Sequence, residues 1–137
     1  MKAIVYSNPG QPEVLQLREV ATPAPKDHEV LIKIHATTAM ATDFGVGRSK
    51  APGAFRSLHP RHPAIVIPGQ DLAGEVEAIG RRVTRFRKGD QIVAWSGLHL
   101  GTYAEYTCLP ERGTLFTKPA NITYEEAATL PVGGLDT

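Results

Sequence analysis

This sequence of 137 residues has little cysteine and no long apolar run. A single cysteine, Cys108, excludes an internal disulfide framework. The N-terminal segment MKAIVYSNPG lacks the apolar core and the small-residue cleavage site of a signal peptide. No apolar run approaches the roughly 20 residues of a membrane-spanning helix. These absences favour a cytoplasmic protein that does not span a membrane.

Net charge is also nearly absent, because 15 basic residues face 14 acidic ones and leave a formal charge of +1. This balance gives no general attraction to nucleic acid or to an acidic membrane surface. The local exception is the run Arg81-Arg-Val-Thr-Arg-Phe-Arg-Lys88, which holds five cations. It suits either a nucleic-acid patch or a solvated hairpin face, and we expect the solvated face and no nucleic-acid partner.

The length and the 42% hydrophobic composition suit one domain with a substantial core. Thirteen glycines and 11 prolines divide the chain into short segments, which favours strands over long helices. Alternating or β-prone runs predict strands at Lys2–Tyr6, Val14–Val20, Glu29–Ala36, Leu72–Ala78, Asp90–Trp95, Gly101–Leu109 and Thr114–Thr117. We expect the first three to form a meander.

The two remaining parts of the chain differ from this pattern. Residues 37–68 form a long irregular passage, which inside a compact domain is often functional. Thr123 and Glu126 form a capping box before apolar residues, so a helix is expected to begin there and to be cut short at Pro131.

Four blocks in one order resemble the N-terminal GroES-like domain of the medium-chain dehydrogenase/reductase superfamily. They are Pro68–Val76; Gly80, Val83 and Phe86 with Lys88–Asp90; Gly101–Tyr106; and Glu125–Ala128 with Leu130–Pro131 and Gly134–Leu135. The resemblance implies a mainly β fold, a partly open β-barrel with short helices. It also implies that residues 1–122 are the substrate-side domain, and that residues 123–137 begin the connecting helix towards a nucleotide-binding Rossmann domain absent from this chain.

Zinc-type members of this superfamily carry a histidine and a glutamate after the glycine of the first block, and a cysteine at about Met40. Here the corresponding residues are Gln70, Asp71 and Met40. A neutral amide and a thioether are poor ligands for Zn²⁺, so no metal is expected. The sequence therefore resembles the zinc-free quinone or enone reductase branch.

In that branch the resemblance implies hydride transfer from NADPH or NADH to a quinone or to an activated C=C or C=O compound. The partner is then a small-molecule substrate, and a homodimer of the full-length form is allowed. The sequence has no Gly-x-Gly-x-x-Gly after a strand, so we expect this chain alone to be inactive. The alternative is a non-catalytic GroES-like binding or scaffold module.

The resemblance implies the following site residues: Asp43, Gln70 and Asp71 as catalytic, and Met40, Thr42, Arg48 and Leu130 as cofactor-binding. Five of these seven residues have a plainer explanation that the sequence leaves open. Asp43 can cap a short helix near Phe44, and Gln70 with Asp71 can stabilise a turn. Met40 can simply pack, and Arg48 can be solvated.

Overall fold

A computed structural model describes residues 1–6, 15–40 and 66–131, and the structural statements below concern these residues. The strands are β1 (Lys2–Tyr6), β2 (Leu15–Glu19), β3 (Glu29–Thr37), β4 (Asp71–Ile79), β5 (Gln91–Trp95), β6 (Tyr106–Pro110) and β7 (Thr114–Thr117). A 3-10 helix, η2 (Gly97–His99), follows β5, and the α-helix α3 (Tyr124–Ala128) follows β7.

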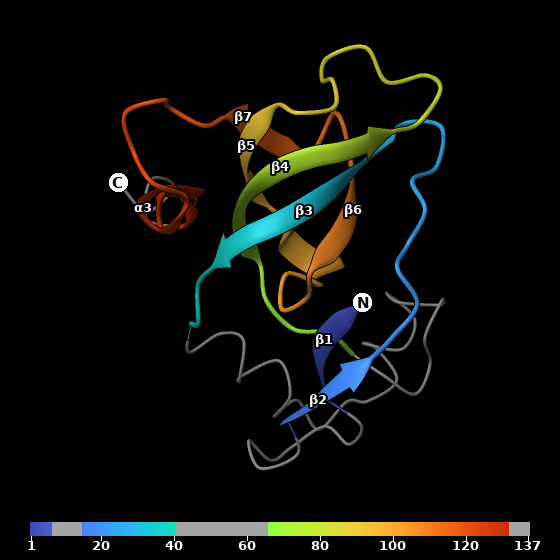
Figure 1. Cartoon of the computed structure of the whole chain (residues 1–137), viewed down its shortest axis with the longest axis vertical. Coiled ribbons are helices and arrows are strands. Elements are labelled where there is room, and N and C mark those ends of the chain that lie inside the picture. The colour runs from blue at the N-terminus through green and yellow to red at the C-terminus, as the bar shows by residue number, and fades with distance from the viewer. Residues whose placement is uncertain (7–14, 41–65, 132–137) are drawn as a thin grey trace.

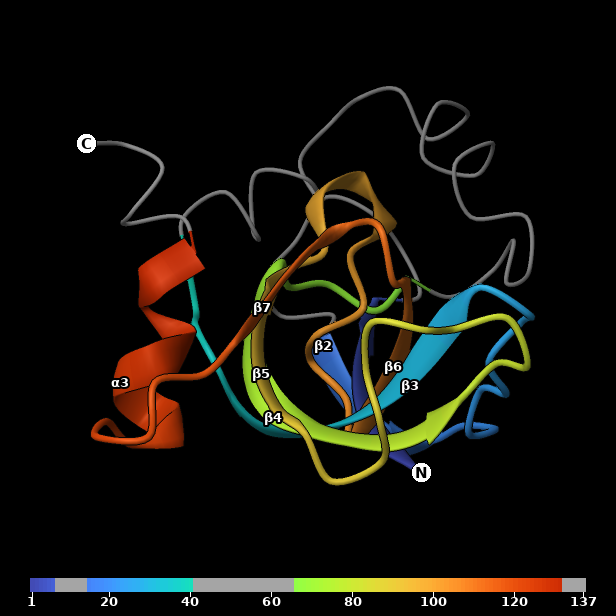
Figure 2. The ribbon, with the colours of Figure 1, turned by 90° about the horizontal axis from the view of Figure 1, so that it is seen from above.

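Five of the strands form one antiparallel sheet in the order β6-β3-β4-β5-β7. Figure 2 shows this sheet curled into an open barrel, with α3 on its outer side. The predicted mainly β, partly open barrel is confirmed. No helix among the described residues has the length and apolar character needed to cross a membrane.

The inner face of the curled sheet carries the main core, because alternate residues of each strand point inward. Its buried members are Val30, Ile32, Leu72, Val76, Val83, Phe86, Ile92, Ala94, Leu109 and Leu115. Gly74 allows β4 to lie close to β3, since a β-carbon there would collide with the backbone oxygen of Lys33.

The outer face of the sheet carries a smaller apolar cluster beneath α3. Ala73 of β4 and Val93 of β5 pack there with Ala127 and Ala128 of the helix. The predicted capping box is present: the Thr123 hydroxyl accepts from the backbone N–H of Glu126 at 3.1 Å, and the Glu126 carboxylate accepts from that of Thr123 at 3.3 Å. The helix therefore begins where the sequence predicts.

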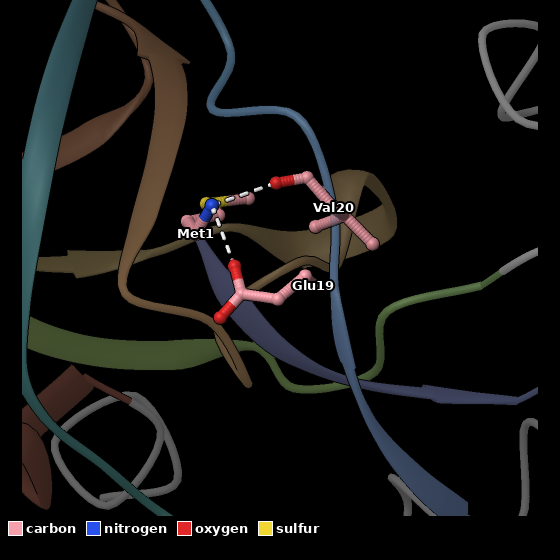
Figure 3. Close-up of polar contacts among 3 residues, drawn as sticks. All are labelled: Met1, Glu19 and Val20. Atoms are coloured by element: carbon pink, nitrogen blue, oxygen red, sulfur yellow. Dashed lines mark hydrogen bonds and ion pairs between the residues drawn. The ribbon is translucent and has the colours of Figure 1, made fainter.

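Strands β1 and β2 form a separate two-stranded sheet beside the barrel (Figure 1). The N-terminal ammonium donates to the backbone oxygen of Val20 at 2.7 Å and lies 3.5 Å from the Glu19 carboxylate (Figure 3). The expected meander of the first three strands is wrong, because β3 pairs with β4 and β6 instead of β2. Alternation fixes which face of a strand is buried but leaves its partner open.

The connection between β4 and β5 is the basic run of the sequence. Arg81, Arg82, Arg85, Arg87 and Lys88 are exposed, while Val83 and Phe86 between them are buried in the core. The carboxylate of Glu111 accepts from the backbone N–H groups of Thr84 and Arg85, each at 3.0 Å. One buried acid therefore orders the segment whose cations face solvent.

The strand expected over Gly101–Leu109 is shorter in the structure, where β6 begins only at Tyr106. Ala104 instead makes an isolated bridge with Ala3, and the backbone N–H of Ile4 donates to Tyr103 at 2.8 Å. The chain thus pairs with β1 first and changes to β3 at about Tyr106, so that one sequence run serves two sheets.

Candidate functional site

The candidate site lies on the outer face of the sheet, at the end where β4 begins and β5 ends. Asp71 is paired with Trp95, and Trp95 with Thr114 on β7. Residues paired in this way share one face of a sheet. Asp71 lies two residues before Ala73, which packs against α3, so this row of side chains is on the same face as the helix.

Asp71 is the charged centre of this row and is only 1% exposed. Its Oδ2 accepts a hydrogen bond from the Thr38 hydroxyl at 2.9 Å, and its backbone oxygen accepts one from the Thr37 hydroxyl at 2.6 Å. The Thr37 hydroxyl also lies 2.9 Å from that of Thr102, which is fully buried. Burial of a carboxylate is costly unless donors surround it, and the Thr38 hydroxyl lowers that cost. The network joins the end of β3 to the start of β4.

Gln70 has a different role from its neighbour, because its side chain is used within the protein. The Gln70 amide Nε2 donates to the backbone oxygen of Gly97 at 3.2 Å, in η2. The backbone oxygen of Gln70 accepts from the N–H of Ser96 at 2.7 Å and from its hydroxyl at 3.2 Å. Gln70 therefore fixes the segment that follows β5.

Helix α3 points its C-terminal end towards this row. Its first residue, Tyr124, stacks on His35 with ring centroids 4.2 Å apart, while Ala127 and Ala128 lie over Ala73 and Val93. Asp71 lies two residues from Ala73 on β4, and Trp95 lies two residues from Val93 on β5. Each step of two residues along a strand is about 7 Å. Figure 2 shows that η2 and the last turn of α3 lie at the same end of the barrel.

The N-terminal end of α3 is held by a buried lysine. Lys118 is 7% exposed, and its ammonium donates to the backbone oxygens of Ile122, at 2.6 Å, and Pro119, at 3.0 Å. The same ammonium lies 5.2 Å from the ring centroid of Tyr124. Burial raises the pKa of Tyr124, and the Glu75 carboxylate adds to this shift. These contacts set the position of the helix on the sheet.

The structure describes four of the seven predicted site residues. Gln70 and Asp71 lie at the start of β4, and Leu130 follows α3 with 46% of its surface exposed. Met40 is half-buried and lies two residues beyond Thr38. The other three predicted site residues, Thr42, Asp43 and Arg48, lie outside the described residues. The functional roles assigned to all seven remain predictions.

Several residues of this site were not predicted from the sequence. Thr37 and Thr38 could have been predicted as site residues, because two hydroxyl donors follow each other at the end of a clearly predicted strand. Trp95 and Thr102 could not have been predicted in this way. The neighbours of Trp95 depend on which strands pair, and those of Thr102 depend on the path of a loop. Only the register of β4 with β5 brings Trp95 opposite Asp71.

The residues at this site do not fit a zinc ion. No group of three or more histidine, cysteine, aspartate or glutamate side chains gathers within the described parts of the chain. Gln70 and Met40 offer an amide and a thioether, and the Asp71 carboxylate already accepts from Thr38. These side chains supply one strong ligand, the Asp71 carboxylate, where a zinc site needs three or four protein ligands.

The chain is similar in sequence to a known domain family and to known proteins. Residues 26–120 match the alcohol dehydrogenase GroES-like domain. The quinone oxidoreductase of Lama guanicoe is 39% identical over 133 residues, which are 96% of this chain and 38% of that protein. The chain therefore spans about two fifths of the length of such relatives.

Solved structures give the same result. The quinone oxidoreductase of Coxiella burnetii superposes with a TM-score of 0.87 at 30% identity, covering 98% of this chain and 42% of that one. The quinone oxidoreductase of Escherichia coli, solved in complex with NADPH, gives a TM-score of 0.81 at 28% identity, covering 99% of this chain and 39% of that one. The family match and the matches to these three proteins all include β3, β4 and β5, which carry the candidate site.

Proposed function

Because the chain belongs to the alcohol dehydrogenase GroES-like domain family, we propose that it is the substrate-side part of a zinc-independent, NADPH-dependent reductase of quinones or of activated C=C and C=O compounds. In this proposal residues 1–122 form the substrate-side domain, and residues 123–137 lead towards the part that binds the nucleotide. The reduced nicotinamide supplies the hydride when it is bound. The quinone oxidoreductase relatives support the reaction class, and the NADPH complex of the Escherichia coli protein supports the choice of nucleotide.

One observation carries the proposal to this chain: a buried carboxylate, Asp71, stands on the α3 face of the sheet and receives a hydrogen bond from Thr38. At 1% exposure, Asp71 is too deeply placed to touch a substrate directly. We assign it a positioning role, in which it holds Thr38 and the end of β3 against β4. Met40 follows Thr38 by two residues, so this bond also limits where the backbone at Met40 can lie.

Gln70 completes this arrangement on the other side of β4. It holds η2 in place through the Gly97 backbone oxygen, and so fixes the end of β5. Leu130, exposed beyond α3, offers an apolar surface that suits one face of a nicotinamide ring. In this proposal the chain contributes position and shape, and excludes water from the reacting groups.

The test uses the complete protein that contains this sequence. Oxidation of NADPH is followed by its absorbance, with 1,4-naphthoquinone or 2-hexenal as the acceptor. We expect oxidation that depends on the acceptor, that is faster with NADPH than with NADH, and that survives a zinc chelator. If neither acceptor supports the oxidation of NADPH, the proposal is overturned and a non-catalytic binding module is favoured. Loss of activity on chelation would overturn its zinc-independent part alone.

A matched pair of variants tests the positioning role. Thr38→Val removes the hydroxyl that donates to Asp71 but keeps the shape of the side chain, and Thr38→Ser restores the hydroxyl. We expect Thr38→Val to lower kcat/KM by at least about tenfold, because a donor to a charged group contributes about 1.5–3 kcal/mol, and Thr38→Ser to recover most of this loss. Equal activity in both variants would remove Asp71 and Thr38 from the mechanism.

A further inference from the structure

Trp95 is the one tryptophan of the sequence and stands within the candidate site. It is the last residue of β5, opposite Asp71 on β4 and Thr114 on β7. This register places the indole on the α3 face, in the same row as Asp71. Trp95 is half-buried.

The segment after Trp95 supports the indole from one side. Gly97 has a φ of +56°, and a β-carbon there would lie 3.6 Å from Cη2 and Cζ3 of the ring. The backbone of η2 therefore approaches the six-membered edge of the indole closely. Gln70 fixes this backbone through its bond to the Gly97 oxygen, and Ser96 is fixed by the backbone of Gln70. The ring is thus held by a hydrogen-bonded support.

The indole nitrogen of Trp95 has no hydrogen-bond acceptor within the described part of the chain, although the atom is buried. An indole N–H can only donate, and nearly all buried donors in folded proteins have a partner. The donor lies at the five-membered edge of the ring, whereas the Gly97 backbone supports the six-membered edge. The Nε1–H is therefore a buried donor that the described residues leave unsatisfied.

We propose that Trp95 is the residue that selects the substrate, a flat conjugated carbonyl compound that lies against the indole and accepts a hydrogen bond from its Nε1–H. This inference rests on the proposed function. A planar ring system matches the flat indole surface, and a carbonyl oxygen matches the single donor. As hydride arrives, negative charge grows on that oxygen, and a donor placed there stabilises it. Because Nε1 is covered in the structure, the oxygen replaces the group that covers it.

Two substitutions in the complete protein separate the ring from its donor. Trp95→Phe keeps an aromatic surface and removes the N–H, whereas Trp95→Leu removes both. The substrates are flat 1,4-naphthoquinone and flexible 2-hexenal, each with NADPH. We expect Trp95→Phe to lower kcat/KM about three- to tenfold for both compounds, because both present a carbonyl oxygen. We expect Trp95→Leu to lose a further tenfold for naphthoquinone only.

A matched control is Phe116→Leu, an aromatic side chain on the same face, one row away and 62% exposed. We expect this variant to keep the wild-type ratio between the two substrates. The urea midpoint of each variant identifies any variant that has lost its fold. If Trp95→Leu does not fold, the milder Trp95→Phe variant still decides the role of the N–H donor.

The outcomes of this experiment are distinct. A wild-type protein that reduces neither compound overturns the proposed function and this inference with it. An active wild type with an unchanged Trp95→Phe variant overturns the donor role alone. Equal losses for both substrates in Trp95→Leu, or a changed ratio in Phe116→Leu, would show that Trp95 does not select for flat molecules.

Discussion

Gly69, immediately before Gln70 and Asp71, offers the sharpest test of the packing beneath the candidate site. Its φ is +97°, and a β-carbon there would collide with the Thr102 hydroxyl and lie 2.5 Å from Cδ1 of Tyr103. Gly89 has nearly the same φ, +95°, but a β-carbon there would meet nothing within 4 Å. The pair Gly69→Ala and Gly89→Ala therefore shares the backbone strain and differs in steric overlap.

The magnitudes follow from these two terms. A β-carbon in left-handed backbone costs about 1–2 kcal/mol, which is all that Gly89→Ala should lose. Overpacking adds about 1–3 kcal/mol at Gly69, because Thr102 is fully buried and its hydroxyl is already bonded to that of Thr37. Gly69→Ala should therefore lose about 2–5 kcal/mol in the free energy of unfolding. This is a large part of the roughly 5–15 kcal/mol that stabilises a typical domain.

Urea unfolding measures the difference directly. Trp95 is the only tryptophan in this sequence, so the fluorescence of this chain reports on the region next to Gly69. With a slope of about 1.5 kcal/mol per M, a 2 kcal/mol difference separates the two midpoints by about 1.3 M. Equal midpoints, or a lower midpoint for Gly89→Ala, would refute the close packing of Thr102 and Tyr103 beneath Gly69.

Three further predictions follow from the contacts described above. The backbone N–H groups of Arg85 and Thr84 lower the pKa of Glu111 below 4.5, so its charge stabilises the fold above that pH. The difference in unfolding free energy between wild type and Glu111→Gln should be full at neutral pH and shrink as the pH falls below about 4.5; a difference that grows in acid contradicts this sign. Thr123→Ala should cost about 1 kcal/mol by removing the cap of α3, measured by thermal unfolding, and a cost no greater than for Thr22→Ala would dismiss the capping box. Metal analysis of the purified chain should find no stoichiometric zinc. One zinc per chain would contradict the conclusion that the residues of the candidate site do not fit a zinc ion.

Much of the barrel could be predicted from local sequence. In strand β3, Val30, Ile32 and Ile34 face the core with the predicted period of two, although Leu31 between them is also buried. The bounds of β1 and β7 were also predicted correctly, because turn residues or prolines stand at their ends. These features depend on neighbours within a few residues, and such information is present in a single chain.

Pairing and polar burial could not be predicted in this way. The return of β6 to pair with β3 joins residues about 75 positions apart, and alternation does not identify a partner. Lys118 and Glu111 look like surface residues in the sequence, yet both are buried with hydrogen bonds to backbone groups. Their partners are backbone atoms, which carry no residue-specific signal.

The same distinction explains why the site was predicted only in part. Gln70 and Asp71 were chosen as a pair, but neighbouring residues at the start of a strand point in different directions. Asp71 faces the α3 side and accepts from Thr38, the residue after β3, whereas Gln70 reaches Gly97 beyond β5. One residue therefore fixes the end of β3 and the other the end of β5, and together they set the spacing of the two strands that flank β4. In the proposed function, a change at Gln70 is expected to reach the substrate through the Gly97 backbone and the Trp95 indole, and a change at Asp71 through Thr38 and through Trp95, which is paired with it.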